Sequence, residues 1–418
     1  MPGEHRLFTA ALGLDAPWEV SDVRFDAAAG RIDFDVRFPG GTRFACPACG
    51  AQGQRVHDTR ERSWRHLHFF QFQAFIHARL PRVHGQECGK TTQVPVPWAR
   101  SGSGFTQLFE ALVVTLCQAM PVNTVAGRLG VSDDALWRIL DHYVHGARAQ
   151  EDFSAVTRIG VDETASRRTQ RYITLFHDFG QGRLLFACDG RNRHTVARFT
   201  EDLRAHGGDP EHIAAVCMDM SKAYIAGVGT HLPAAAITFD AFQVIQLANQ
   251  AVEEVRRAEA KHQPALKHTR WTWLKDKHKW NARQIVQAHT LSRSRLKTAR
   301  AWRLKEALRD LLRNGENPQQ AARLFAKWYS WARRSRLEPF KRLAITLKNH
   351  LHGLLNAFDS HLSNGRVEGI NSLIQAAKAR ARGYRTTRSL ITIAYLIAGK
   401  LVHLPRSPYA RLKPTTSS

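Results

Sequence analysis

The alternation of apolar and polar residues divides the chain into four stretches with different periods. Up to about residue 100 the period is close to two, as in Val23–Phe38 and Phe69–Val83, and this predicts half-buried strands. Residues 104–147 have the spacing of short helices, residues 157–260 alternate strand-like with helix-like segments, and residues 261–418 are mostly helical in pattern. Between the first two stretches, Ser101–Gly104 is expected to be a linker.

Two apolar runs in the third stretch end in an aspartate. We predict buried strands over Thr157–Asp162 and Ile213–Asp219, each with its acid at the end. Other predicted elements of this stretch are strands over Arg171–Phe179 and Arg183–Cys188, a glycine turn between them, and an amphipathic helix over His194–His206. The resulting β-β-β-α-β-α order is that of a ribonuclease-H-like fold, in which two strand-end carboxylates can share one edge of the sheet.

Paired carboxylates of this kind suit two-metal phosphoryl transfer. In-line attack on a phosphodiester is catalysed by two divalent ions about 4 Å apart, and Mg²⁺ or Mn²⁺ prefers oxygen ligands. A third acid is expected from a helix beside the sheet, and Glu368 in the segment Asn364–Lys378 fits. Glu368, Asn371, Gln375 and Lys378 lie three or four residues apart, along one helix face. We expect Glu368 to bind metal, and Asn371, Lys378 and Arg382 to contact DNA.

Position alone does not select these acids. An aspartate at a strand end is often only a turn residue. Asp178, Asp189 and Asp240 also end strand-like runs. Glu163 is next to Asp162, but the alternation along a strand would turn its side chain to the opposite face.

A Cys/His cluster in the first stretch has the spacing of a zinc site. Cys46 and Cys49 form a CxxC turn, and His84 and Cys88 form a second pair, which together make a four-ligand set for a structural Zn²⁺. The strand-rich segment between the pairs fits a zinc-ribbon-like unit. Four other histidines could replace His84, and a reduced CxxC without metal is the alternative: His57, His66, His68 and His77. Cys117, Cys188 and Cys217 lie in apolar surroundings and are expected in the core.

Residues 121–140 have a helix-turn-helix pattern. Gly130 allows the turn, and Ser132 is a ready N-cap for the second helix. This helix would present residues 133–138 to the major groove, so the candidate DNA contacts are Ser132, Asp133, Trp137 and Arg138. A helical hairpin that does not touch DNA is the alternative interpretation.

The charge balance favours a polyanionic partner. The chain has 61 Lys and Arg against 36 Asp and Glu, a formal net charge of +25. A basic excess of this size attracts nucleic acid, and a membrane surface is the weaker candidate. From Gly369 to Ser418 there are nine Lys or Arg and no acid, as expected of a phosphate-contacting segment.

The sequence predicts a cytoplasmic, nucleoid-associated protein. Met1–Leu14 lacks the apolar core of a secretory signal. The apolar run Leu390–Gly399 is about half of the ~20 residues that span a bilayer, so it is expected to be a buried helix. The six cysteines are therefore expected to be reduced or metal-bound.

Taken together, these motifs resemble the bacterial insertion-sequence transposases of the ISL3 family over nearly the whole chain. The resemblance rests on the Cys/His pairs, the helix-turn-helix and four short segments: Ile159–Glu163, Val216–Met220, Phe239–Phe242 and Asn364–Asn371. It implies that Asp162, Asp219 and Glu368 form a DDE triad, and that the helical stretch between Asp219 and Glu368 is an insertion into the ribonuclease-H-like domain. The chain departs from the family pattern at Gln243, where a His is common, and at the HxxxC form of the second zinc pair.

The expected architecture is a multidomain α+β protein. Its predicted domains are a zinc-binding domain (1–100), a helix-turn-helix domain (101–150), a ribonuclease-H-like core (151–260), a helical insertion (261–360) and C-terminal core helices carrying the third acid (361–418). Six of the ten tryptophans lie between Asp219 and Glu368. Most of them are expected to pack between helices, and we hypothesise that one or two contact a transposon end.

The predicted function is DNA transposition. The head would bind terminal inverted repeats, the three acids would hold two Mg²⁺ or Mn²⁺ ions for strand cleavage and transfer, and two DNA ends would require a dimer or larger complex. Two alternatives remain: a DNA-binding transcriptional regulator on a catalytically inactive scaffold, and a ribonuclease-H-like nuclease without strand transfer.

Overall fold

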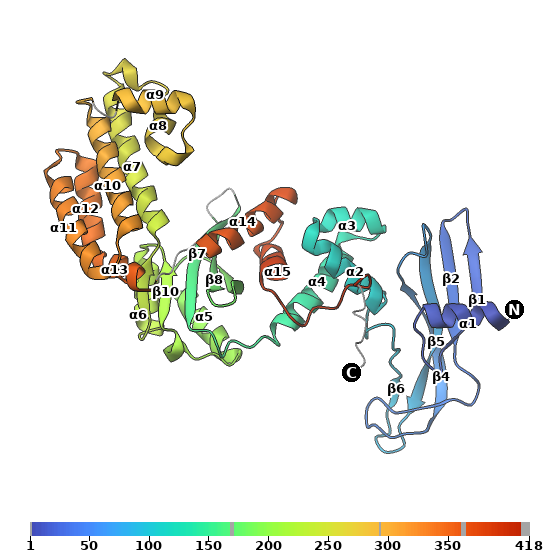
Figure 1. Ribbon diagram of the computed structural model, residues 1–418. Helices are drawn as coiled ribbons and strands as arrows, with labels where there is room; N and C mark the ends of the chain where they lie inside the picture. The colour runs from blue at the N-terminus through green and yellow to red at the C-terminus, as the bar shows by residue number, and fades with distance from the viewer. Residues whose placement is uncertain (1, 168–170, 292–293, 361–364, 411–418) are drawn as a thin grey trace, which may run out of the picture. The chain divides into compact units, whose positions relative to one another are not determined.

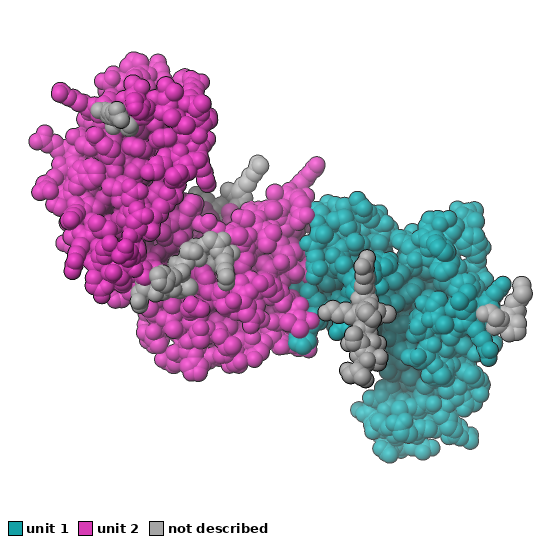
Figure 2. Space-filling model, in the orientation of Figure 1, with its two compact units in different colours: residues 1–146, 403–418 teal, residues 147–402 magenta. Residues whose placement is uncertain are grey.

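The computed structural model describes residues 2–167, 171–291, 294–360 and 365–410. Contacts within the chain divide it into two compact units, residues 1–146 with the chain from His403 onward, and residues 147–402 (Figure 2). The first unit contains the Cys cluster and the helix-turn-helix. The second contains the three candidate acids.

The first unit is built on a six-stranded sheet of order β1-β2-β5-β4-β3, with β6 paired to β5 (Figure 1). Its elements are α1 (Pro2–Ala11), β1 (Glu19–Asp26), β2 (Arg31–Arg37), β3 (Arg43–Phe44), β4 (Gln54–Arg65), β5 (Gln73–His84) and β6 (Thr91–Gln93). Phe34, Trp64 and Ile76 are buried in its core. The predicted stretch Val23–Phe38 is two antiparallel strands rather than one, because the chain turns at Gly30, which has a φ of 63°.

Ser101–Gly104 connects β6 to α2 (Gln107–Ala119), and it is packed against both the sheet and the helix. The Ser103 side chain is buried and donates to Glu110 Oε1 at 2.7 Å, and the Gly104 carbonyl accepts from the Arg65 amide. The short polar residues form a turn that packs between the sheet and the next helix, where their hydrogen-bonding groups are satisfied.

Three helices follow: α2 (Gln107–Ala119), α3 (Val122–Leu129) and α4 (Asp133–Arg148). The predicted turn is present, since Gly130 ends α3 with a φ of 66°, in the left-handed region that glycine tolerates. The Ser132 hydroxyl accepts from the Ala135 amide and so caps α4 as expected. Leu136, Ile139 and Leu140 bury the inner face of α4.

The second unit contains a five-stranded sheet of order β11-β10-β7-β8-β9. Its strands and their first two helices are β7 (Arg158–Arg167), β8 (Arg171–Asp178), β9 (Arg183–Asp189), α5 (Arg193–Ala205), β10 (Ala215–Met218), α6 (Lys222–His231) and β11 (Ala236–Phe239). The predicted β-β-β-α-β-α order and ribonuclease-H-like topology are therefore confirmed. One boundary was wrong: β7 continues beyond Asp162 to Arg167, because its pairing with β8 extends past the acid.

Helices cover both faces of this sheet. On one face, Phe176 of β8 stacks on Phe199 of α5 with ring centroids 4.3 Å apart, and Thr174 contacts the Tyr224 hydroxyl of α6. On the other, the Tyr395 hydroxyl of α15 (Thr387–Ala398) accepts from the Ala187 amide. Residues 368 onward of α14 (Gly365–Arg380) also lie on this second face, against β7. The predicted buried helix over Leu390–Gly399 corresponds to α15.

A group of helices is inserted between β11 and α14 (Figure 1). They are α7 (Ala241–Ala260), α8 (Arg270–Leu274), α9 (Ala282–Leu291), α10 (Lys297–Asn314), α11 (Pro318–Arg334), α12 (Glu338–Asn349) and α13 (Leu351–Ser360). Their buried residues form one continuous apolar cluster with the sheet, through α7 and β11. Among the described residues, no helix is long and apolar enough to cross a membrane.

Helix α13 approaches β11 so closely that one position excludes a side chain. A Cβ on Gly353 would lie 2.4 Å from the Phe239 ring. We expect Gly353→Ala to lower the free energy of unfolding by about 1–3 kcal/mol, because the ring must move in a packed core. Gly229→Ala in α6 is the matched control: its Cβ would meet nothing within 4 Å, so the helix should gain about 0.5–1 kcal/mol. Urea unfolding of both variants checks this, and equal shifts in one direction would contradict it.

Candidate active site

Strand register brings three aspartates to one edge of the second sheet. β10 runs parallel to β7 on one side and to β11 on the other, with Cys217 opposite Gly160 and Met218 opposite Phe239. Continuing these registers places Asp219 beside Asp162 of β7 and beside Asp240, which follows β11. Parallel strands lie about 4.8 Å apart, so the three carboxylates are neighbours.

Helix α14 adds the fourth acid and is fastened to β7 by polar side chains. Asn371 Nδ2 donates to Asp162 Oδ2, Gln375 Nε2 to Thr164 Oγ1, and Lys378 Nζ to the Ala165 carbonyl. Glu368 lies one turn before Asn371 on the same helix. Asn364, the first residue of the predicted motif, lies outside the described residues.

Asn371 and Lys378, which were predicted to contact DNA, form hydrogen bonds with β7 in this structure. Within this structure, Asn371 orients an acid and Lys378 ties α14 to β7. Glu163 lies on the opposite face of β7 from Asp162, as the strand alternation predicts, because Asp162 faces α14 whereas Glu163 contacts Tyr224 of α6. Burial raises the pKa of Glu163, the Asp219 carboxylate adds to this rise, and Tyr224 and Arg191 oppose it.

Burial is the largest cause of the raised pKa values of Asp162, Asp219 and Glu368. It raises the pKa of Asp162 to about 6, and the Asp219 and Asp240 carboxylates add to this rise, against hydrogen bonds from the Glu163 amide and Asn371. Burial also raises the pKa of Asp219, which accepts from the Ser221 amide at 3.0 Å. The pKa of Glu368 is raised by burial and then by Asp240. Several carboxylates that repel one another in a partly dry site favour a bound cation.

The donor set fits divalent metal ions. All four groups offer oxygen ligands, which Mg²⁺ and Mn²⁺ prefer. No Lys or Arg of the described residues is among the groups that shift the pKa of Asp162 or Glu368. No three of these carboxylates converge within 4.8 Å of one another in the described residues, and the site is therefore broader than a closed cage.

The Cys cluster of the first unit is a second place where metal ligands converge. The Sγ atoms of Cys46, Cys49 and Cys88 lie within 4.8 Å of one another. The Cys46 and Cys88 sulfurs are 3.8 Å apart, which is the separation of about 3.8 Å expected for thiolates 2.3 Å from a tetrahedral Zn²⁺. The Cys49 and Ala48 amides donate to the Cys46 sulfur and lower its pKa to about 6. These observations fit a zinc ion held by three cysteines.

The predicted histidine ligands are not part of this cluster. The Nδ1 atom of His84 lies 3.2 Å from the Thr91 hydroxyl, and its side chain is exposed. The other candidate histidines have partners elsewhere: His57 pairs with Asp58, His66 with Thr106, His68 with Arg65, and His77 with Ser63 and Asp33. Cys117, Cys188 and Cys217 are buried as predicted.

The helix-turn-helix leaves a polar helix face exposed. Arg138 is exposed and Trp137 is half-buried on α4, while Asp133 and Asp134 occupy its first turn. The two acids interact favourably with the helix dipole. Ser132 uses its hydroxyl to cap the helix, so its predicted contact with DNA would have to share this group.

Comparison with known proteins agrees with all three parts of the chain. A model of the ISL3 transposase domain matches residues 159–394, a model of the helix-turn-helix domain of transposase family ISL3 matches residues 94–144, and a model of the zinc-finger of transposases IS204/IS1001/IS1096/IS1165 matches residues 42–88. The transposase for insertion sequence element IS1557 from Mycobacterium tuberculosis is 30% identical, over 96% of this chain and 97% of its own length. The transposase for insertion sequence element IS1001 from Bordetella parapertussis is 27% identical, over 81% and 85%.

The chain belongs to the ISL3 family of DDE transposases. The resemblance inferred from its motifs is thereby confirmed, as are the zinc-ribbon and helix-turn-helix classes of its N-terminal parts.

Asp240 lies with the candidate acids of this transposase, whereas the sequence left it among several strand-end acids. It is buried, caps α7 by accepting from the Phe242 amide at 3.1 Å, and neighbours both Asp162 and Glu368. The other two candidates lie apart from the site. Asp178 is 3.6 Å from Arg183 and accepts a hydrogen bond from the Gly180 amide in its turn. Asp189 is exposed at the end of β9, the outermost strand on the side of the sheet away from β11.

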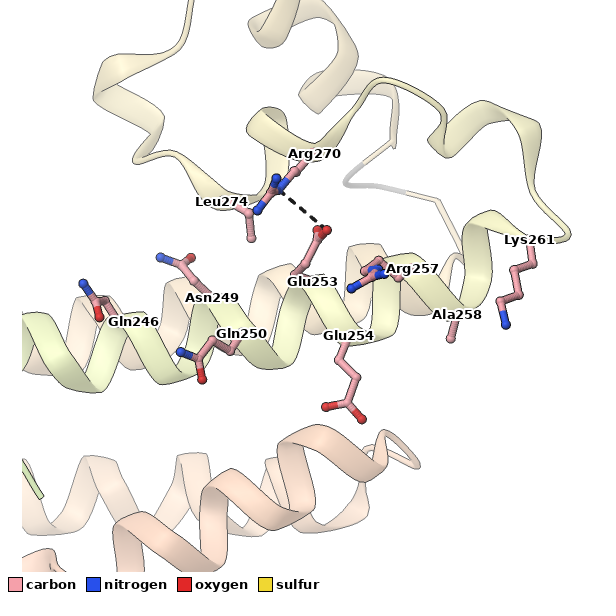
Figure 3. Close-up of a pocket in the computed structure, with 10 residues that line it drawn as sticks. All are labelled: Gln246, Asn249, Gln250, Glu253, Glu254, Arg257, Ala258, Lys261, Arg270 and Leu274. Carbon is pink, nitrogen blue, oxygen red and sulfur yellow. Dashed lines mark ion pairs between the residues drawn. The ribbon is translucent and has the colours of Figure 1, made fainter. Parts of the chain in front are cut away.

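Two surface cavities of the transposase lie on different elements, one on α14 and one on the helical insertion. One of about 780 Å³ lies beside the β7–α14 contact and is lined by Lys378, Arg382 and Arg385 among others. Another of about 700 Å³ lies on the insertion, along α7, where Arg270 reaches Glu253 at 3.6 Å (Figure 3). Glu253 is 13 residues beyond Asp240, about 20 Å along α7, so this second cavity is not part of the acid site.

The raised pKa of Asp162 predicts a pH-dependent cost to stability. Its unfolded pKa is near 3.8 and its folded pKa is about 6, so the folded state binds the proton more tightly. Above pH 6 the ionised form destabilises the fold by about 3 kcal/mol, and this cost vanishes as pH falls below about 4.

We therefore expect Asp162→Asn to stabilise the protein at pH 8, with an advantage over the wild type that shrinks as pH falls from 7 to 4. Unfolding measured over this range without added divalent cations checks the expectation. Asp189→Asn, at an exposed site, is the control. A pH-independent difference for Asp162→Asn would show that burial does not perturb this carboxyl.

Proposed function

We propose that this transposase binds the terminal inverted repeats of its insertion sequence and cuts and joins DNA at Asp162, Asp219 and Glu368. The observation that carries the proposal is the placement of acids from β7, β10 and α14 at one edge of the sheet, with α14 continuing from there to a cavity lined by basic residues. The β11 acid Asp240 would shape the same site from its other side.

The three acids would hold two divalent cations, Mg²⁺ or Mn²⁺. When bound, such ions activate the attacking oxygen and stabilise the leaving one. The protein's own part is to supply negative charge at fixed positions. Both oxygens of Asp162 already accept hydrogen bonds, Oδ1 from the Glu163 amide at 2.7 Å and Oδ2 from Asn371, which hold the carboxylate plane in place.

The basic end of α14 would guide the DNA backbone into this site. Lys378 and Arg382 lie 10 and 14 residues beyond Glu368, and they line the cavity with Arg385. Ten helical residues span about 15 Å, so a guanidinium or ammonium group at this position can neutralise phosphates further along the DNA backbone than the one at the metal-binding acids. Asn371 contributes indirectly, by orienting Asp162.

The first unit would recognise the element's ends. Asp133, Trp137 and Arg138 lie at the start of α4, the second helix of the helix-turn-helix, which in such motifs enters the major groove. Joining two ends to a target requires at least two copies of the chain, so a homodimer or larger complex is part of the proposal. In the insertion, Trp273 and Trp328 are buried, whereas Trp271 and Trp331 are exposed and are the candidates for contact with a DNA end.

The deciding experiment is a cleavage assay with the element's own flanking DNA. With Mg²⁺ or Mn²⁺ the wild type should cut at the repeat ends, and Glu368→Gln should lose at least about 100-fold in rate, because one metal-binding charge is removed. End binding, measured by gel shift, should be kept. Glu338→Gln, at an exposed residue of α12, is the matched control and should cut normally.

Each alternative function gives its own result in this assay. End binding without cleavage by the wild type would support a DNA-binding regulator. Cleavage without joining of the cut ends to target DNA would support a nuclease.

Recognition by α4 makes a separate prediction. Arg138→Ala should weaken binding to the repeat end by about 10-fold or more if the guanidinium reads a base edge, with a smaller loss on unrelated DNA. Arg24→Ala, on exposed strand β1, is the control and should bind both DNAs as the wild type does. Equal losses on both DNAs would mean that Arg138 contacts only phosphate.

A further inference from the structure

The Cys cluster faces a residue that has no side chain. A Cβ placed on Gly85 would lie 2.7 Å from the sulfurs of Cys46 and Cys88 and 3.2 Å from that of Cys49. The three thiols thus close over the glycine, at the corner of the cluster where a fourth ligand would enter. The φ of Gly85 lies outside the left-handed region, so its backbone conformation does not require glycine.

Gly85 has the same place in its turn as Cys46 has in the first. The Gly50 amide donates to the Cys46 carbonyl and the Gly89 amide to the Gly85 carbonyl, both at 2.8 Å. The Cys46 amide donates to Ala51, and the Gly85 amide to Lys90, at 2.9 and 3.0 Å. The two turns are therefore equivalent knuckles, and the second contributes one thiol where the first contributes two.

No fourth ligand of the usual metal-binding residue types is present at this corner among the described residues. No His, Asp or Glu of the described chain joins the three sulfurs in a common group. The Thr92 hydroxyl, 3.6 Å from the Cys46 sulfur, is a neutral oxygen and a poor match for zinc beside three thiolates.

We propose that Cys46, Cys49 and Cys88 hold zinc with its fourth position open to a small donor from solution, water or a free thiol, because Gly85 supplies no ligand. Zinc in the known structural sites has four protein ligands, whereas an open position admits exchangeable ligands. The ribbon of this chain would therefore bind zinc less tightly than a four-ligand site and would accept an added thiol. This inference requires that the three cysteines bind zinc, but it does not depend on the cleavage chemistry.

Cobalt substitution of the full-length protein tests the open position directly. Co²⁺ bound in place of zinc, with a phosphine reductant that does not coordinate, should give an absorption spectrum of three sulfurs and one lighter donor. Adding β-mercaptoethanol should shift the wild-type spectrum toward that of four sulfurs. Gly85→Cys should have the four-sulfur spectrum at the outset and should not respond to the thiol.

Zinc competition with a chromogenic chelator measures the cost of the missing ligand. Gly85→Cys should bind zinc at least about 100-fold more tightly than the wild type, because a fourth thiolate is added to the site. His84→Ala should leave both the cobalt spectrum and the zinc affinity unchanged. Gly85→Ala, which adds a Cβ but no sulfur, should not gain affinity.

Several outcomes would overturn the proposal. A changed spectrum in His84→Ala would make His84 the fourth ligand, and zinc-dependent dimerisation would place that ligand in a second copy of the chain. Stoichiometric metal without any response to added thiol would mean that the position is closed. Failure to bind one metal per chain would instead contradict the zinc site itself. If Gly85→Cys does not fold, the thiol titration of the wild type decides alone.

Discussion

The contact between α14 and β7 is the constraint on which the candidate active site depends. It joins Asn371 to Asp162 across 209 positions of sequence, with the whole helical insertion between them. Three polar side chains on successive turns of α14 meet Asp162, Thr164 and Ala165 of β7, so the helix cannot rotate or slide without losing these contacts. Glu368 precedes these contacts on the same helix face, and its approach to the aspartates follows from them.

The ionised acids of the candidate site lower the stability of the folded state. Burial and mutual repulsion raise the pKa values of Asp162, Asp219 and Glu368, so their ionised forms cost free energy in the absence of a cation. The apolar cluster that runs from the sheet into the insertion offsets this cost. A site that is destabilised when empty and stabilised by divalent ions is what the proposed metal-dependent chemistry requires.

The Cys cluster of the first unit depends on local backbone structure. Two equivalent backbone turns carry the three sulfurs, and each turn is closed by its own amide hydrogen bonds. The shape of each turn therefore does not depend on contacts with distant helices. Local structure can thus preserve the shape of the second turn even where glycine replaces a ligand. The same unit carries the helix-turn-helix, whose packing against the sheet is made by the Ser101–Gly104 turn and Thr106 rather than by a flexible connection.

The sequence by itself determined those features that depend on residues a few positions apart. They include the strand and helix order of the second unit, the Gly130 turn with its Ser132 cap, the Cys46–Cys49 knuckle and the set of strand-end acids. Tertiary structure alone decided which acids converge, that β7 runs past Asp162, that Asn371 serves Asp162, and that Gly85 rather than His84 faces the thiols. The physical reason is that sheet register and helix docking are set by contacts between distant segments, which no local pattern of residues encodes.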